Sequence, residues 1–215
     1  MAENIVELLT DVADAIREKK GSNEPINAQN FANEIKNLPS GGGSGDIVIT
    51  ANNGVYGGTT DANTRYEAYI GGKITELGAA AFGGDKRIIK LSMSDNITKI
   101  GVNTFLNCSN LADVRLSNII ATVDSNSFGG PAITEIILPN AVTGIGSGAF
   151  NSCNTLRRAI IRPLSPPRLW GASFENNAAD RLIYVPDESV DAYKSATNWA
   201  AYADAIRPMS ELPQE

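Results

Sequence analysis

The most regular feature of the chain is a phenylalanine that returns at a nearly constant interval. Spacings of 23, 23, 22 and 24 residues separate five of the six phenylalanines, which are Phe82, Phe105, Phe128, Phe150 and Phe174. Each of them closes a short apolar segment, as in ITKIGVNTF of residues 97–105, and each is followed by a polar or glycine-rich turn. Self-similarity at a fixed period indicates a repeat architecture. One repeat is called a rung below and is named by its phenylalanine.

Behind each phenylalanine, apolar and polar residues alternate over three to five positions. Examples are Ile88-x-x-Leu91-x-Met93, Leu111-x-x-Val114-x-Leu116 and Ile133-x-x-Ile136-x-Leu138. Alternation with a period of two is typical of a strand with one buried face, so we expect one short strand in each rung. A single rung cannot bury its own apolar face, and the rungs must therefore stack into one continuous core.

These repeats resemble a known family. The segments ITKIGVNTFLNCSNLADVRL (97–116) and ITEIILPNAVTGIGSGAFNSCNTL (133–156) are similar to BspA-like leucine-rich repeats. The resemblance extends over about residues 70–206, and it implies a mixed α/β solenoid of leucine-rich repeats of about 23 residues. Two places depart from the pattern, Val123-Asp124 and the segment 165–170, and we expect local bends there.

The two ends of the array differ from its rungs. Residues 46–73 predict short strands that cap the first rung, because an uncovered edge would favour polymerisation. Residues 74–186 hold the repeats, and residues 187–215 predict a helical cap and tail similar to the C-terminal caps of BspA-like arrays. We expect Trp199 to cover the last rung, with a ligand-stacking role as the alternative.

Residues 1–39 follow a helical pattern instead. Two apolar stripes with helical spacing predict a small hairpin. They are Ile5, Leu8, Leu9, Val12 and Ile16 in the first helix, and Phe31, Ile35 and Leu38 in the second. A hairpin of this size buries too little surface to be stable alone. We therefore predict an anchoring or oligomerisation module, with a trimer as our hypothesis, joined to the rungs by the Gly/Ser hinge of residues 40–45. The alternative is a hairpin that packs on the first rung.

The chain contains only two cysteines, Cys108 and Cys153, at equivalent positions two rungs apart. Successive rungs are separated by about 4.8 Å, the spacing of paired strands. The two thiols should then lie about 10 Å apart, too far for a disulfide bond. We expect both cysteines to be buried structural thiols.

Composition and charge narrow the possible functions. The chain has no histidine, the commonest general base and metal ligand, and its formal net charge is −6. An acidic surface repels nucleic acid and anionic lipid. We find no phosphate-binding loop, no paired catalytic carboxylates and no apolar stretch long enough to span a membrane. We therefore expect no enzymatic activity, no catalytic residue, no cofactor and no metal site, and neither nucleic acid nor membrane as a partner.

A binding surface is the remaining candidate for function. Residues between the buried positions of the strands should point outward along one face. The candidates for partner contact are Lys90, Arg115, Glu135, Arg158, Arg162 and Tyr184. Arginines and a tyrosine on an acidic protein are suited to bind a partner carboxylate or an anionic glycan. The alternative is that these residues only make the strand face soluble.

The leading hypothesis is a bacteriophage virion protein, either a head or tail fibre or an accessory adhesin. Residues Glu7–Leu38 resemble a module of gut bacteriophage tail and fibre proteins, and the N-terminus lacks the basic region of a signal peptide. The resemblance implies anchoring to other virion proteins or to copies of the same chain, and display of the repeats toward a host-surface protein or glycan. Two alternatives remain: a BspA-like adhesin on the bacterial cell surface, and an intracellular interaction scaffold.

Overall fold

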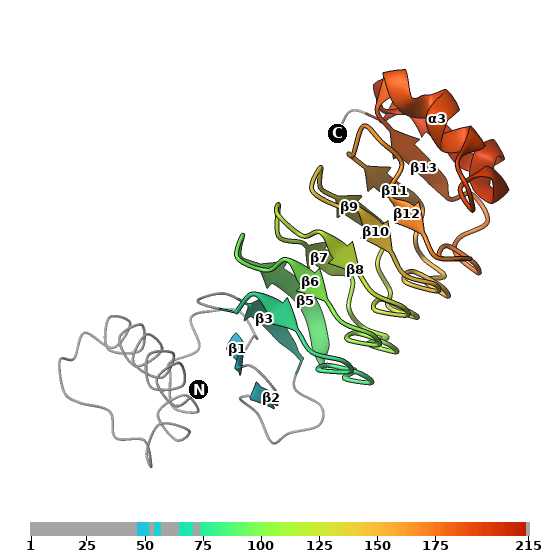
Figure 1. The fold of residues 1–215 in the computed structure, drawn as a ribbon. Coiled ribbons are helices and arrows are strands. Elements are labelled where there is room, and N and C mark those ends of the chain that lie inside the picture. Colours follow the sequence, from blue (N-terminus) through green and yellow to red (C-terminus); the bar gives the residue numbers. More distant parts are fainter. Residues whose placement is uncertain (1–46, 52–53, 57–64, 71–73, 214–215) are drawn as a thin grey trace, which may run out of the picture.

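The computed structural model describes residues 47–51, 54–56, 65–70 and 74–213 of the 215-residue chain. The predicted helical module of residues 1–39 and the hinge of residues 40–45 lie outside the described residues. The anchoring side chains predicted there are Ile5, Leu8, Leu9, Val12, Ile16, Phe31, Ile35 and Leu38. In the described part, strands stack one beside the next along a single axis, and helix α3 lies at the C-terminal end (Figure 1).

The longer ladder of the fold consists of β3 and the strands that follow the phenylalanines. They are β3 (Tyr66–Ile70), β5 (Ile88–Met93), β7 (Asp113–Arg115), β9 (Glu135–Leu138), β11 (Arg158–Ile161) and β13 (Leu182–Val185). Parallel pairing joins β3 to β5 and β5 to β7, and it joins β9 to β11 and β11 to β13. At the N-terminal end, β1 (Ile47–Ala51) pairs parallel with β3, and β2 (Gly54–Tyr56) pairs antiparallel with β1. Strands β1, β2 and β3 therefore occur between residues 46 and 73, where short strands were predicted.

Each rung contains a second strand, so the expectation of one strand per rung was wrong. These strands are β4 (Glu76–Leu77), β6 (Lys99–Ile100), β8 (Thr122–Val123), β10 (Gly144–Ile145) and β12 (Arg168–Leu169). They form their own parallel sheet in the order β12-β10-β8-β6-β4. Two residues are too few to show an alternating pattern in the sequence. The pairing runs through β8 and β12 without a register shift, so the bends expected there are absent from this ladder.

The core of the stack is a continuous column of phenylalanine rings. Consecutive ring centroids from Phe82 to Phe174 are 4.9, 5.1, 5.6 and 5.3 Å apart, and every pair is stacked. All five side chains are buried. The three inner rings are stacked on both faces, which stabilises the column through apolar burial and dispersion. The predicted stacking of the rungs into one continuous core is thus confirmed.

Buried hydroxyl groups tie three of the five phenylalanine turns to the rung before them. Thr104, Ser127 and Ser173 directly precede their phenylalanines and are fully buried. Their hydroxyls donate to carbonyl oxygens at equivalent places in the preceding rung, those of Gly78 (3.1 Å), Gly101 (2.9 Å) and Gly146 (2.7 Å). A buried hydroxyl must find such a partner, because leaving it unbonded costs about 1–3 kcal/mol.

Both cysteines lie in the core as free thiols, as predicted. The Cys108 thiol donates to the carbonyl oxygen of Phe82 (3.1 Å), and the Cys153 thiol donates to that of Phe128 (3.0 Å). Burial raises the pKa of each thiol to about 12. At neutral pH both thiols are therefore protonated, and each links its turn to the preceding rung.

The C-terminal segment packs on the last rung. It consists of η1 (Asp187–Ser189), α3 (Val190–Ser195), η2 (Ala200–Ala205), β14 (Ile206–Pro208) and η3 (Met209–Glu211). Trp199 is 1% exposed, and its ring lies 6.1 Å from that of Phe174, while Tyr202 meets Phe174 edge-on at 5.8 Å. Strand β14 pairs parallel with β13 and extends the longer ladder by one strand. No helix in the described part of the chain is long and apolar enough to cross a membrane.

Replacing Phe128 by alanine should lower the free energy of unfolding by about 3–5 kcal/mol, because it removes a ring that is stacked on both faces at the centre of the column. Urea denaturation of the full chain measures this change. The matched control is Val102→Ala, whose side chain is 41% exposed and should change stability by less than about 0.5 kcal/mol. Equal effects of the two substitutions would contradict a stabilising column.

Candidate binding surface

The outer face of the longer ladder contains mutually compensating charges. Lys90 and Asp113 are register partners on β5 and β7, with 3.4 Å between Nζ and Oδ2. Glu135 and Arg158 are register partners on β9 and β11, with 2.5 Å between Oε2 and Nε. Opposite charges facing each other across strands stabilise a sheet modestly. Three of the predicted contact residues, Lys90, Glu135 and Arg158, are therefore engaged in ion pairs.

Tyr184 does not lie on the exposed face, and its place in the predicted surface was wrong. Its side chain is only 4% exposed. The reason is β14, which the sequence did not reveal. In register, Tyr184 has Ile160 of β11 on one side and Arg207 of β14 on the other, so neighbours on both sides cover the ring.

The ladder is interrupted between β7 and β9. In the described part of the chain, β7 is the last strand of one sheet and β9 the first of another, although they belong to consecutive rungs. In other rungs a backbone bond precedes the strand, from Ala112 N–H to Ile89 O (3.0 Å) and from Arg157 N–H to Thr134 O (2.9 Å). The structure contains no equivalent bond from Thr134 N–H to Ala112 O.

The Phe128 rung differs from its neighbours just before this break. Four residues (129–132) separate Phe128 from Ile133, whereas five (106–110) separate Phe105 from Leu111. Pro131 also occupies the position of the two cysteines, three residues after the phenylalanine. Proline has no N–H or thiol to donate, and the shorter turn changes how the chain enters β9. These are the local differences that accompany the missing bond.

A groove of about 500 Å³ lies over the interruption. Its apolar lining includes Val114 and Leu116 from the Phe105 rung and Ile137 and Pro139 from the Phe128 rung. Its charged lining residues are Asp113, Arg115, Glu135 and Arg162. The structure therefore brings together three of the six predicted contact residues: Arg115, Glu135 and Arg162. The apolar lining was not predicted from the sequence. The shortened turn of the Phe128 rung is the feature of the sequence that could have indicated it.

The charges of the groove leave a cationic excess. Asp113 and Glu135 are compensated by Lys90 and Arg158, neither of which lines the groove. Among the described residues, no carboxylate forms a salt bridge with Arg115 or Arg162, and both residues are exposed. Two guanidinium groups beside an apolar floor are suited to hold a carboxylate by paired, charge-assisted hydrogen bonds.

The rim of the groove is ordered by Asn118. Its backbone N–H donates to Asp95 Oδ1 (2.7 Å), and its side-chain Nδ2 donates to Oδ2 (3.0 Å). These hydrogen bonds lower the pKa of Asp95, with a smaller contribution from the charge of Arg115. Asp95 thus stays ionised to a lower pH than an ordinary aspartate does, and it contributes a fixed negative charge near Arg115. Within the described ranges, no group of three His, Cys, Asp or Glu side chains could hold a metal ion.

Comparison with known proteins identifies the repeats. The model of the BspA type leucine rich repeat region matches residues 67–168 in six copies. No curated protein sequence matches the chain. The family match starts at residue 67, so the resemblance of Glu7–Leu38 to a phage module stays a prediction. The matched segment has a leucine-rich-repeat fold with parallel strands and few helices, as expected.

Two solved structures are similar to the chain. The pneumococcal vaccine antigen PcpA is 18% identical, with a TM-score of 0.48, and the match covers 70% of this chain and 44% of that one. The leucine rich repeat protein of T. pallidum (TpLRR) is 20% identical, with a TM-score of 0.36, and the match covers 54% of this chain and 64% of that one. The chain thus spans less than half of the pneumococcal antigen.

The interruption predicts a local difference in amide hydrogen exchange. The Thr134 amide should exchange at least about tenfold faster than the Ala112 and Arg157 amides, because only the latter two donate to the preceding rung. Exchange followed by NMR on the full chain gives all three rates together, with Ala112 and Arg157 as internal controls. Equal protection at the three sites would show that the ladder is continuous.

Proposed function

We propose that this chain is a non-enzymatic interaction module that recognises a carboxylate-bearing protein partner at the groove between β7 and β9. The observation that carries the proposal is the pair Arg115 and Arg162, which form no salt bridge with any described residue. They flank an apolar groove in a chain whose formal net charge is −6. On a protein of net negative charge, a cationic groove attracts an acidic ligand that the rest of the surface repels.

The apolar lining strengthens this recognition. Leu116 is 7% exposed, and Pro139 is also buried, so a side chain seated in the groove would lose much of its contact with water. Charge-assisted hydrogen bonds are stronger where water is excluded. The guanidinium group also matches the planar geometry of a carboxylate, which gives orientation as well as attraction. An Asp or Glu next to an apolar side chain fits this arrangement.

The biological setting follows from the repeats. BspA-type repeats support a role in adhesion or in protein interaction, and we therefore propose a cell-surface adhesin or an interaction scaffold as the setting. Placement on a bacteriophage virion depends on residues 1–39 alone, because only their resemblance to phage modules suggests it. That placement remains our second hypothesis.

Replacing Arg115 and Arg162 together by glutamine should weaken binding of acidic peptides at least about tenfold, because it removes both charge-assisted contacts. The measurement uses an array of apolar–acidic heptapeptides, each with an Asn/Gln twin, probed with the full chain. The control is Arg157→Gln with Arg207→Gln, which changes the net charge equally but lies outside the groove.

Two results would contradict this function. If the acidic peptides and their amide twins bind equally, the groove does not recognise carboxylates. If the control variant weakens binding as much as the groove variant, the attraction is a general effect of charge. Thermal unfolding of both variants should resemble that of the unchanged chain, because all four arginines lie wholly or partly in solvent.

We also propose that residues 1–39 assemble copies of the chain, since their two apolar stripes need a partner surface. Light scattering after size-exclusion chromatography should give a defined oligomer, a trimer in our hypothesis, for the full chain, and a monomer for residues 46–215. Monomers in both cases would rule out self-assembly through this segment. An oligomer in both cases would place the assembly surface within the rungs.

A further inference from the structure

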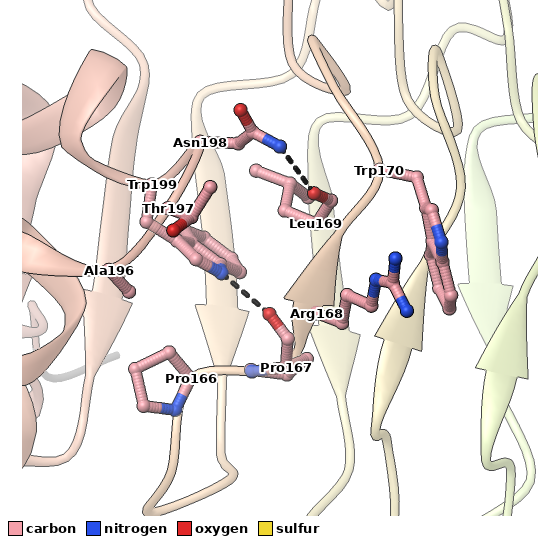
Figure 2. Close-up of a pocket in the computed structure, with 9 residues that line it drawn as sticks. All are labelled: Pro166, Pro167, Arg168, Leu169, Trp170, Ala196, Thr197, Asn198 and Trp199. Carbon is pink, nitrogen blue, oxygen red and sulfur yellow. Dashed lines mark hydrogen bonds between the residues drawn. The ribbon is translucent and has the colours of Figure 1, made fainter.

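A second pocket lies where the last rung meets the C-terminal segment. It is lined by residues 166–170, which include β12, and by residues 196–199, which precede η2. Its volume is about 540 Å³. Figure 2 shows Arg168 and Trp170 on one side, Thr197 and Asn198 on the other, and the ring of Pro166 below them. The pocket belongs to the shorter ladder, so it is separate from the groove between β7 and β9.

Arg168 is the one charged residue that lines this pocket, and stacking holds it in place. Its guanidinium carbon lies 4.9 Å from the centre of the Trp170 ring. Among the described residues, no carboxylate forms a salt bridge with Arg168. Stacking on an indole leaves the N–H groups at the edge of the guanidinium plane free to donate. Arg168 therefore presents an oriented cationic donor.

The position of the Trp170 ring depends on the absence of a side chain at Gly144. Its ring occupies the space of a side chain at Gly144, since a Cβ atom there would lie 2.4 Å from Cζ3 of the indole. Gly144 is the register partner of Arg168, so the glycine creates the place in which the indole can stack on the arginine. Even so, 48% of Trp170 stays exposed. An exposed tryptophan that the core does not need is typical of a contact surface.

The opposite wall offers hydrogen-bonding groups for hydroxyls. The side-chain Nδ2 of Asn198 donates to the carbonyl oxygen of Leu169 (2.6 Å), which orients its Oδ1 as an acceptor. Asn198 has a φ of 66°, so the turn holds it in the left-handed region. The neighbouring Thr197 is exposed and contributes a hydroxyl group to the lining.

We propose that this pocket binds a sugar that carries a carboxylate, of the uronic acid class. Arg168 would hold the carboxylate, Thr197 and Asn198 would bind ring hydroxyls, and Trp170 would pack against the apolar face of the sugar. A volume of about 540 Å³ suits one or two sugar rings. An extended peptide would need a longer groove or a strand edge with free backbone groups. β12 is the edge strand of its ladder, but the side chains of Trp199 and Asn198 already donate to its outward carbonyl oxygens, those of Pro167 and Leu169.

The test uses the full chain and its own tryptophans. The chain has two, and Trp199 is 1% exposed, so a ligand in the pocket should act mainly on the fluorescence of Trp170. The probes are trigalacturonic acid and its methyl ester, in which a neutral methyl ester group replaces each charged carboxylate. The Kd of the acid, measured from the change in fluorescence, should be at least about tenfold lower than that of the ester. One charge-assisted contact supplies a difference of this size.

Matched variants locate the effect. Arg168→Gln should weaken binding of the acid about tenfold and remove its advantage over the ester. Arg168→Lys keeps the charge but loses the planar fork, so it should bind more weakly than the unchanged chain. Trp170→Ala should abolish binding as measured by calorimetry. Arg157→Gln, which lies outside both the groove and this pocket, should bind the acid as the unchanged chain does.

Several outcomes would overturn the proposal. These are equal binding of acid and ester, unchanged binding by Arg168→Gln, and tighter binding of an acidic or proline-rich peptide at the same residues. Circular dichroism of each variant shows that a lost signal is not lost folding, and Arg168→Gln keeps the readout intact because both tryptophans remain. The result does not depend on the groove between β7 and β9, so the two proposals can fail separately.

Discussion

Stacking of one rung on the next is the interaction on which this fold depends. A rung of some 23 residues has one apolar side and no opposing layer of its own, so it is buried only by its neighbours. The column from Phe82 to Phe174 supplies this burial, and Trp199 and Tyr202 close it at the C-terminal end. Buried hydroxyls and the two thiols add polar links to the preceding rung, which keep the turns in register with the rings.

Both candidate sites occur where a rung departs from the regular repeat. In the Phe128 rung, a turn one residue shorter and Pro131 accompany the loss of a backbone bond, and the groove lies over that place. In the Phe150 rung, Gly144 leaves room on the sheet for the indole of Trp170, which belongs to the Phe174 rung. Trp170 then orients Arg168. A perfectly regular ladder would pair every strand and fill every position, so irregular rungs are the natural places for recognition.

Charge pairing explains why only a few arginines are candidates. Across the two ladders, Lys90 pairs with Asp113, Lys99 with Asp124 and Arg158 with Glu135. Exposed pairs of this kind add little to stability, but they neutralise one another and leave the surface without a strong local field. Cations that form no salt bridge among the described residues then stand out, because their charge remains available to an external anionic ligand.

The sequence by itself determined the repeat, its core positions and the state of the cysteines. Each of these follows from a period along the chain, and stacking converts that period into contact between equivalent residues such as Phe105 and Phe128. Tertiary structure alone decided the rest. Tyr184 is buried because β14 pairs with β13. Trp170 lies over Gly144 because β12 pairs with β10 at this point of the shorter ladder. Such contacts join positions that are not equivalent in the repeat, and no period in the sequence records them.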